Sequence, residues 1–101
     1  RPVMSGDTEI AADDAEVTII TATFNGPISE DIEFSVNGGS PSTVSANGTT
    51  AQLTFGPVGV AGVYSINCAS PTYGSSLIDI RTTYEQLKDN TMKQEYLEEL
   101  V

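Results

Sequence analysis

The chain of 101 residues contains no histidine and no tryptophan, and its only cysteine is Cys68. Histidine is the commonest general base and a frequent metal ligand, so the usual Ser-His-Asp triad cannot be assembled here. One cysteine cannot form an internal disulfide, which leaves packing to hold the fold together. An alternating pattern puts Cys68 on the same strand face as Tyr64 and Ile66, so we expect it to be buried as a small hydrophobic residue.

Positive charge is also scarce. Fourteen Asp and Glu residues stand against four Lys and Arg, which gives a formal net charge of −10. A surface of this sign repels phosphate groups and anionic lipid head groups, so we expect no nucleic-acid partner. The chain has no apolar run long enough to cross a bilayer, so we also expect no membrane insertion.

The carboxylates offer little chemistry in the absence of histidine. Paired acids occur at Asp13-Asp14 and at Glu30-Asp31, in polar, turn-like segments that predict solvated side chains rather than a catalytic pair. Loop carboxylates can bind calcium, but the acids of 7–16 and 30–33 lack the spacing of an EF-hand. The sequence therefore favours a plain acidic surface, with no enzymatic activity, no metal site and no cofactor.

Short alternating runs dominate the chain instead. Glu16–Phe24 is rich in β-branched residues, and Ile32–Val36 and Thr49–Phe55 alternate apolar with polar positions. Turn residues separate these runs, among them Asn47-Gly48, a favoured type I′ hairpin pair. The other predicted strands are Thr8–Ala11, Ser42–Ala46, Val63–Ala69 and Ser76–Ile80. About seven strands without helical periodicity between them predict an antiparallel β-sandwich over residues 1–81.

The periodicity changes after residue 81. Thr83 and Gln86 fit a capping box, and apolar residues then recur at helical spacing. The sequence therefore predicts an amphipathic α-helix over residues 82–101, serving as a linker or an oligomerisation segment. One interpretation is that it packs back on the sandwich or leads into a further domain. The other is a seam with other copies, formed by Tyr96, Leu97, Leu100 and Val101.

Leu53–Ser70 carries the most specific motif. Leu53-Thr54-Phe55, a spaced Val58 and then Ala61-Gly62-Val63-Tyr64-Ser65-Ile66 resemble the passage from strand E to strand F of immunoglobulin-superfamily domains. The resemblance implies an Ig-like sandwich whose structural corner is formed by Tyr64, Gly62 and Ile66. In this family the corner tyrosine bonds back to the backbone through its hydroxyl, and Ile66 would stand where the bridging cysteine usually lies.

A disulfide-free sandwich of this kind is similar to the Ig-like modules of tailed-phage virion proteins and bacterial surface proteins. The run Asn47–Ala51 fits bacterial Ig-like repeats of the invasin type almost as well. The resemblance implies a non-enzymatic structural and interaction module on a virion or an extracellular cell surface. Its partners would be other proteins or further copies of itself, with the helix joining it to a parent protein or to symmetry mates.

Loops are the expected contact surfaces of such a module. They are Asn25–Asp31, Asn37–Pro41 and Ser70–Ser75, with Asn25, Gly26, Asn37, Gly38 and Tyr73 as the candidate contact residues. An alternative function is a carbohydrate-binding or adhesin module of a cell-surface protein. In that case Tyr73, an aromatic residue in a loop, would stack on a surface glycan.

Overall fold

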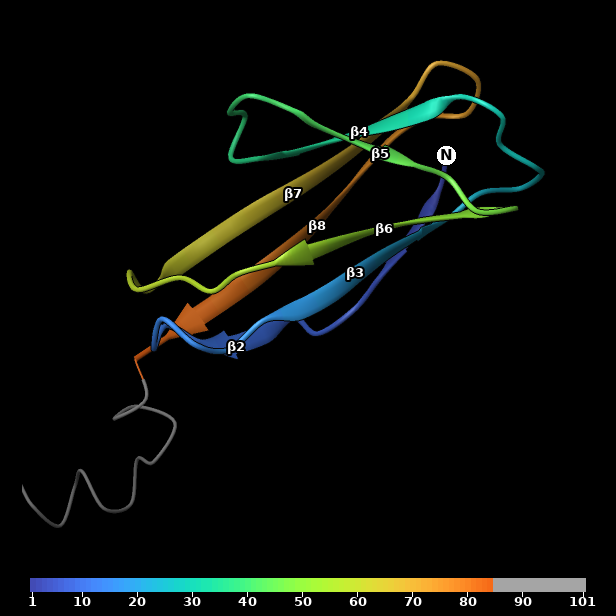
Figure 1. Ribbon diagram of the computed structural model, residues 1–101. Helices are drawn as coiled ribbons and strands as arrows, with labels where there is room; N and C mark the ends of the chain where they lie inside the picture. Colours follow the sequence, from blue (N-terminus) through green and yellow to red (C-terminus); the bar gives the residue numbers. More distant parts are fainter. Residues whose placement is uncertain (85–101) are drawn as a thin grey trace, which may run out of the picture.

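The computed structural model describes residues 1–84, which form two β-sheets packed around one core (Figure 1). The eight strands are β1 (Val3–Ser5), β2 (Glu9–Ala11), β3 (Thr18–Thr23), β4 (Asp31–Val36), β5 (Ser42–Ser45), β6 (Thr50–Phe55), β7 (Gly62–Ser70) and β8 (Gly74–Thr83). One sheet has three strands in the order β1-β3-β6, and the other has five in the order β2-β8-β7-β4-β5.

Side-chain alternation explains the three-stranded sheet. In β3, buried positions such as Thr18 and Ile20 alternate with outward ones. β6 pairs antiparallel with β3 over its whole length, from Phe55 opposite Thr18 to Thr50 opposite Thr23, and β1 adds a short antiparallel strand on the other edge of β3. Because successive side chains point to opposite faces, one face of this sheet enters the core and the other faces away from it.

The five-stranded sheet is built around a long hairpin. β7 and β8 pair antiparallel and close with Ser70 opposite Gly74. β4 pairs antiparallel with β7, and β5 with β4. On the opposite edge β2 runs parallel to β8, with Glu9 opposite Arg81. The sheet is therefore mixed rather than purely antiparallel.

The inner faces of both sheets meet in a single apolar core. Its largest fully buried side chains include Phe34, Ile10, Ile20, Ile32, Ile66 and Ile80. Cys68 is also fully buried, and this burial raises the pKa of its thiol to about 11. The expectation that Cys68 serves as a small core residue is confirmed.

The N-terminal segment joins the two layers, because β1 belongs to one sheet and β2 to the other. The chain crosses between them through Gly6, which has a φ of 145°. A Cβ atom at this position would lie 2.6 Å from Cδ1 of Ile20 and 2.9 Å from the carbonyl oxygen of Ile19. Only glycine allows the chain to pass this close to β3.

The predicted architecture of seven antiparallel strands followed by a helix is wrong on three counts. The structure has eight strands, because Val3–Ser5, which is not among the predicted strands, pairs with β3. The short strand expected near Thr8–Ala11 exists as β2, but it pairs in parallel with β8. Residues 1–84 also contain no helix.

The start of the predicted helix is strand instead. Thr82 and Thr83 belong to β8, which runs past the expected boundary at residue 81. Thr82 is buried, and its hydroxyl accepts a hydrogen bond from the amide of Gly62 at 3.0 Å. The carbonyl of Thr83 accepts the amide of Ala12 at 2.6 Å. Sheet pairing has therefore outweighed the local capping signal, while the rest of the predicted helix, including its seam, lies outside the described residues.

Candidate functional site

The structural corner lies where the chain enters β7. The hydroxyl of Tyr64 donates to the carbonyl oxygen of Val60 at 2.7 Å. The Tyr64 ring packs against Phe55 of β6 with a centroid separation of 5.3 Å, so it links the two sheets. Gly62 is anchored to Thr82 of β8, and Ile66 is fully buried in the core. In this arrangement the three residues brace the fold and leave no side chain aimed at a ligand.

Tyr73 stabilises the end of the molecule where the loops Asn25–Asp31 and Ser70–Ser75 meet. Its ring contacts Phe24 at a centroid distance of 5.6 Å, and its hydroxyl donates to the carbonyl of Pro27 at 3.2 Å. A Cβ atom on Gly26 would lie 2.7 Å from the Tyr73 hydroxyl, so glycine lets the 25–30 segment approach the ring. These contacts join the loop before β4 to the turn between β7 and β8.

Glu30 and Ser70 tie the same two loops together a second time. The Ser70 hydroxyl accepts the amides of Thr72 and Tyr73 at 3.2 and 3.1 Å and donates to Oε1 of Glu30 at 3.2 Å. Hydrogen bonds from the Thr72 side chain, foremost, and from Ser70 hold the pKa of Glu30 below its ordinary value. These polar groups of the two loops therefore hydrogen-bond to one another.

The predicted contact loop Asn37–Pro41 lies at the other end of β4 from Asn25–Asp31, because it follows β4 whereas Asn25–Asp31 precedes it (Figure 1). Asn37 and Gly38 have φ values of 52° and 72° and form the centre of a tight turn, closed by the Gly39 amide on the Val36 carbonyl at 2.9 Å. The Asn37 side chain accepts the Ser65 amide at 2.8 Å. The three loops thus do not form a single contact surface.

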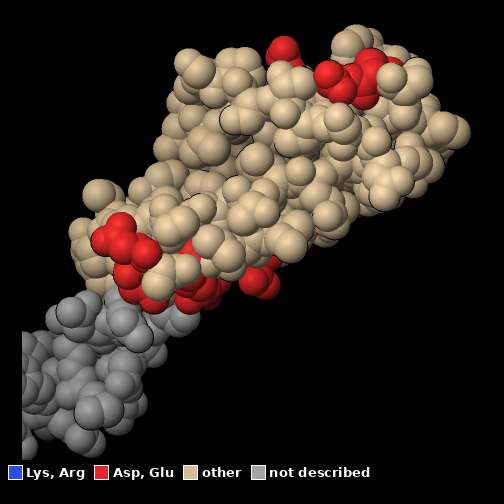
Figure 2. All heavy atoms as spheres, viewed as in Figure 1, with Lys and Arg blue, Asp and Glu red and all other residues tan. Residues whose placement is uncertain are grey.

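Acidic residues gather towards the two ends of the face drawn in Figure 2 and leave uncharged surface between them. Asp13 accepts the amides of Ala15 and Glu16 at 3.0 and 2.8 Å, so this carboxylate supports a local turn. Residues 1–84 hold no group of three or more His, Cys, Asp or Glu side chains that could bind a metal ion.

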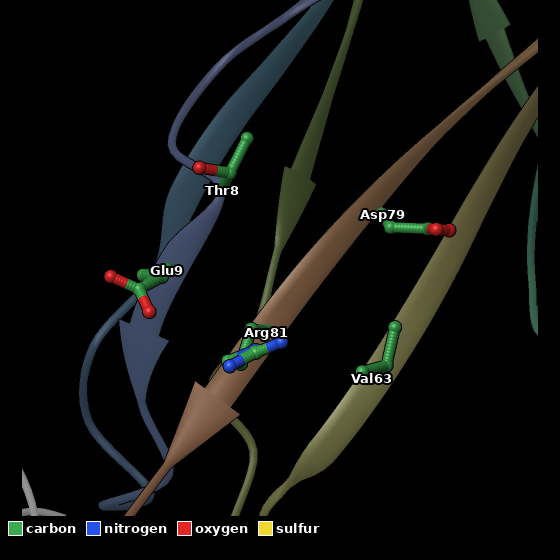
Figure 3. Close-up of a pocket in the computed structure, with 5 residues that line it drawn as sticks. All are labelled: Thr8, Glu9, Val63, Asp79 and Arg81. Atoms are coloured by element: carbon green, nitrogen blue, oxygen red, sulfur yellow. The ribbon is translucent and has the colours of Figure 1, made fainter.

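A shallow hollow lies on the outer face of the five-stranded sheet, where β2, β8 and β7 run side by side (Figure 3). It is lined by Thr8, Glu9, Val63, Asp79 and Arg81. Asp79 is already engaged by the hydroxyl of Ser65 at 2.6 Å. The hollow is a charged strip of an open sheet face.

A different surface stands out once the fold is known: the outward face of the three-stranded sheet, here called the neutral face. Its residues are Val3, Ser5, Ile19, Thr21, Thr23, Thr50, Gln52 and Thr54. None is charged, although the chain has a net charge of −10. Val3 is 69% exposed and Ile19 53%. The sequence analysis missed this surface because it looked for contacts in loops, although the outward positions of the 16–24 and 49–55 runs already showed the signal.

Comparisons with protein-family models, with curated proteins and with solved structures gave no match. Within residues 1–84 no helix is long and apolar enough to span a membrane.

Proposed function

We propose that this chain is a non-enzymatic structural and interaction module that assembles with a parent protein or with further copies through the neutral face. The observation that carries the proposal is the distribution of charge: the chain has a net charge of −10, yet the neutral face carries no charged residue. Acidic side chains repel a similarly charged surface, whereas a face of hydroxyls, one amide and two exposed aliphatic side chains can be covered without burying an unpaired charge. A virion or a bacterial surface is a setting in which such repeated contacts act together.

The division of the strands supports the proposed kinship with disulfide-free Ig-like modules. In the immunoglobulin sandwich strands A, B and E share one sheet, while C, F and G share the other and C′ extends it. Here β1, β3 and β6 form one sheet, and β4, β7 and β8 lie in the other with β5 beside β4. The Tyr64 bond to Val60 gives the same kinship a second, independent support.

A carbohydrate-binding or adhesin function finds no comparable support. Such a site needs an aromatic ring presented to the ligand. The ring of Tyr73 is already packed on Phe24, and its hydroxyl is engaged by Pro27. We therefore do not propose Tyr73 as a glycan platform.

Two matched substitutions test the neutral face. Ile19→Lys places a charge on this face, and Leu77→Lys places the same charge on the outer face of the five-stranded sheet, where Leu77 is 63% exposed. Sedimentation velocity of the full chain from micromolar to millimolar concentration should show self-association that Ile19→Lys weakens and Leu77→Lys does not. Equal effects of the two variants would contradict the proposal.

A further inference from the structure

Three asparagines of this chain are followed directly by a glycine, at Asn25-Gly26, Asn37-Gly38 and Asn47-Gly48. In such a pair the glycine nitrogen can attack the side-chain carbonyl carbon of the asparagine, because glycine has no Cβ atom to obstruct the approach. All three asparagines are exposed to water. Exposure therefore does not separate the three pairs, whereas the hydrogen bonds around each asparagine do.

The attack closes a five-membered ring, so it requires a particular geometry. The glycine nitrogen has to reach Cγ of the asparagine, which requires rotation about the Cα–C bond and rotation of the side chain. An asparagine whose backbone or side chain is hydrogen-bonded in another orientation must first break those bonds. We therefore expect the reaction to be slow where such bonds are present and fast where they are absent.

Asn37 is held by two hydrogen bonds to Ser65. Its amide donates to the carbonyl of Ser65 at 2.8 Å, and its Oδ1 accepts the amide of Ser65 at 2.8 Å. Ring closure would move the side-chain amide of Asn37 away from Ser65 and break the second of these bonds. The fold therefore protects Asn37.

Asn47 is held through its backbone. Its amide donates to the carbonyl of Thr50 at 2.8 Å, and its carbonyl accepts the amide and the hydroxyl of Thr50 at 3.1 and 3.2 Å. Rotation about the Cα–C bond of Asn47 turns this carbonyl out of the hairpin and breaks the bonds that it accepts. The fold therefore protects Asn47 as well, although its side chain is exposed.

Asn25 lies in the loop between β3 and β4, in a short link whose two ends are fixed (Figure 1). On one side the amide of Phe24 donates to a backbone carbonyl at 2.7 Å, and on the other the carbonyl of Pro27 accepts the hydroxyl of Tyr73 at 3.2 Å. Between these ends neither Asn25 nor Gly26 makes a hydrogen bond to any of residues 1–84. Rotation at Asn25 therefore breaks no hydrogen bond of its own.

We propose that Asn25 is a site of spontaneous deamidation in the folded protein, with water as the only co-reactant. The nitrogen of Gly26 gives up its proton and forms a bond to Cγ of Asn25, while the bond from Cγ to the side-chain nitrogen breaks and ammonia leaves. Water then opens the succinimide ring, and nothing is oxidised or reduced. The reaction needs no partner, so it goes beyond the assembly proposed above and does not depend on it.

Either product changes the loop that Tyr73 holds. Opening of the ring at one carbonyl gives an aspartate at position 25, and opening at the other gives an isoaspartate, in which the main chain runs through the former side chain. Both products place a negative charge in a shallow hollow that Asn25 shares with Arg1. The isoaspartate also adds one atom to the main chain between Phe24 and Pro27, so this form should lose contacts to Tyr73 and unfold at a lower temperature.

Peptide mapping by mass spectrometry after incubation of the full chain at mildly alkaline pH tests the assignment. Asn25 should deamidate about tenfold faster than Asn37 and Asn47, because one or two hydrogen bonds must break before either of these can react. The rate at Asn25 should rise with pH, since the attacking nitrogen of Gly26 has to lose its proton. Equal rates at the three sites, or a faster reaction at Asn37 or Asn47, would overturn the proposal.

The urea-unfolded chain is the control for the effect of the fold. The hydrogen bonds that hold Asn37 and Asn47 are lost on unfolding, so the three sites should react at similar rates in urea. A tenfold preference for Asn25 that persists in urea would show that the local sequence selects this site, which contradicts the structural argument.

A matched pair of variants checks the reacting residue. Asn25→Gln lengthens the side chain by one methylene, so the five-membered ring cannot form and the fast release of ammonia should disappear. Asn47→Gln makes the same change at another exposed asparagine and should leave the fast release unchanged. Fast release that survives Asn25→Gln, or that disappears in Asn47→Gln, would contradict the assignment, and thermal unfolding checks that both variants fold.

Discussion

Removing one hydroxyl from the corner should measurably destabilise the domain. Tyr64→Phe keeps the ring and its contact with Phe55 but deletes the 2.7 Å hydrogen bond to the carbonyl of Val60. A typical intramolecular hydrogen bond contributes about 1 kcal/mol net, and an unsatisfied buried partner adds further cost. Here Val60 is 66% exposed, so water can replace the lost donor at its carbonyl.

The expected loss is therefore about 1 kcal/mol in the free energy of unfolding, without the further cost of an unsatisfied buried partner. For a domain of this size that corresponds to a fall in Tm of about 4–8 °C. Urea unfolding followed by circular dichroism measures this loss of stability. An unchanged m-value would show that the substitution alters the stability and not the surface exposed on unfolding.

Tyr73→Phe provides the comparison, because it removes a longer bond of 3.2 Å at the loop end. It should cost less than Tyr64→Phe. If Tyr64→Phe is as stable as the wild-type chain, or if it changes self-association without changing stability, the corner does not hold the fold as described.

Four further predictions follow from the described contacts. Thr82→Val removes the buried hydroxyl that bonds the backbone of Gly62 and should cost about 1–3 kcal/mol in urea unfolding. Gly6→Ala forces a Cβ atom against Ile20 at a φ of 145° and should cost at least about 1–3 kcal/mol, or prevent folding, as thermal unfolding will show. The pKa of Glu30 is lowered in the folded state, so the contribution of this carboxylate to stability is present above its ordinary pKa of 4.5 and is lost as the pH falls through the lower folded value. Glu30→Gln should therefore flatten the acid limb of a stability–pH profile. Cys68, fully buried and with a pKa raised to about 11, should react with thiol reagents at neutral pH only after unfolding, and fast labelling of the native chain would contradict its place in the core.

Much of the strand pattern could be predicted because the side chains themselves encode it. Ile32, Phe34 and Val36 alternate with polar residues, and β4 follows that run almost residue for residue. The β-branched run of 16–24 likewise became β3. Where one face of a strand is buried, alternation specifies both the strand and its inward side.

Other features depend on partners distant in the sequence. Val3–Ser5 is too short for a periodic signal and becomes a strand only because β3 offers an edge. Thr83 matched a helix cap locally, but pairing with β2 keeps it extended. Tertiary pairing outweighs local preference in both cases.

Turn geometry was the other weakness of the sequence analysis. The asparagine–glycine pair with two positive φ values is Asn37-Gly38, whereas at Asn47-Gly48 only the glycine has one. The Asn47 turn instead centres on residues 48–49, with Asn47 paired to Thr50. The candidate site could not be predicted either, because composition pointed to loops, whereas the arrangement of the two sheets exposes the neutral face.

The most direct test of assembly through the neutral face is a dilution series of the isotopically labelled full chain followed by NMR. The account predicts that the amide signals of Ile19, Gln52 and Thr54 shift with concentration, while those of Leu77 and of the loop residues Asn25 and Asn37 do not. Concentration-dependent shifts confined to Leu77 or to the loops, or no shifts up to millimolar concentration, would contradict it.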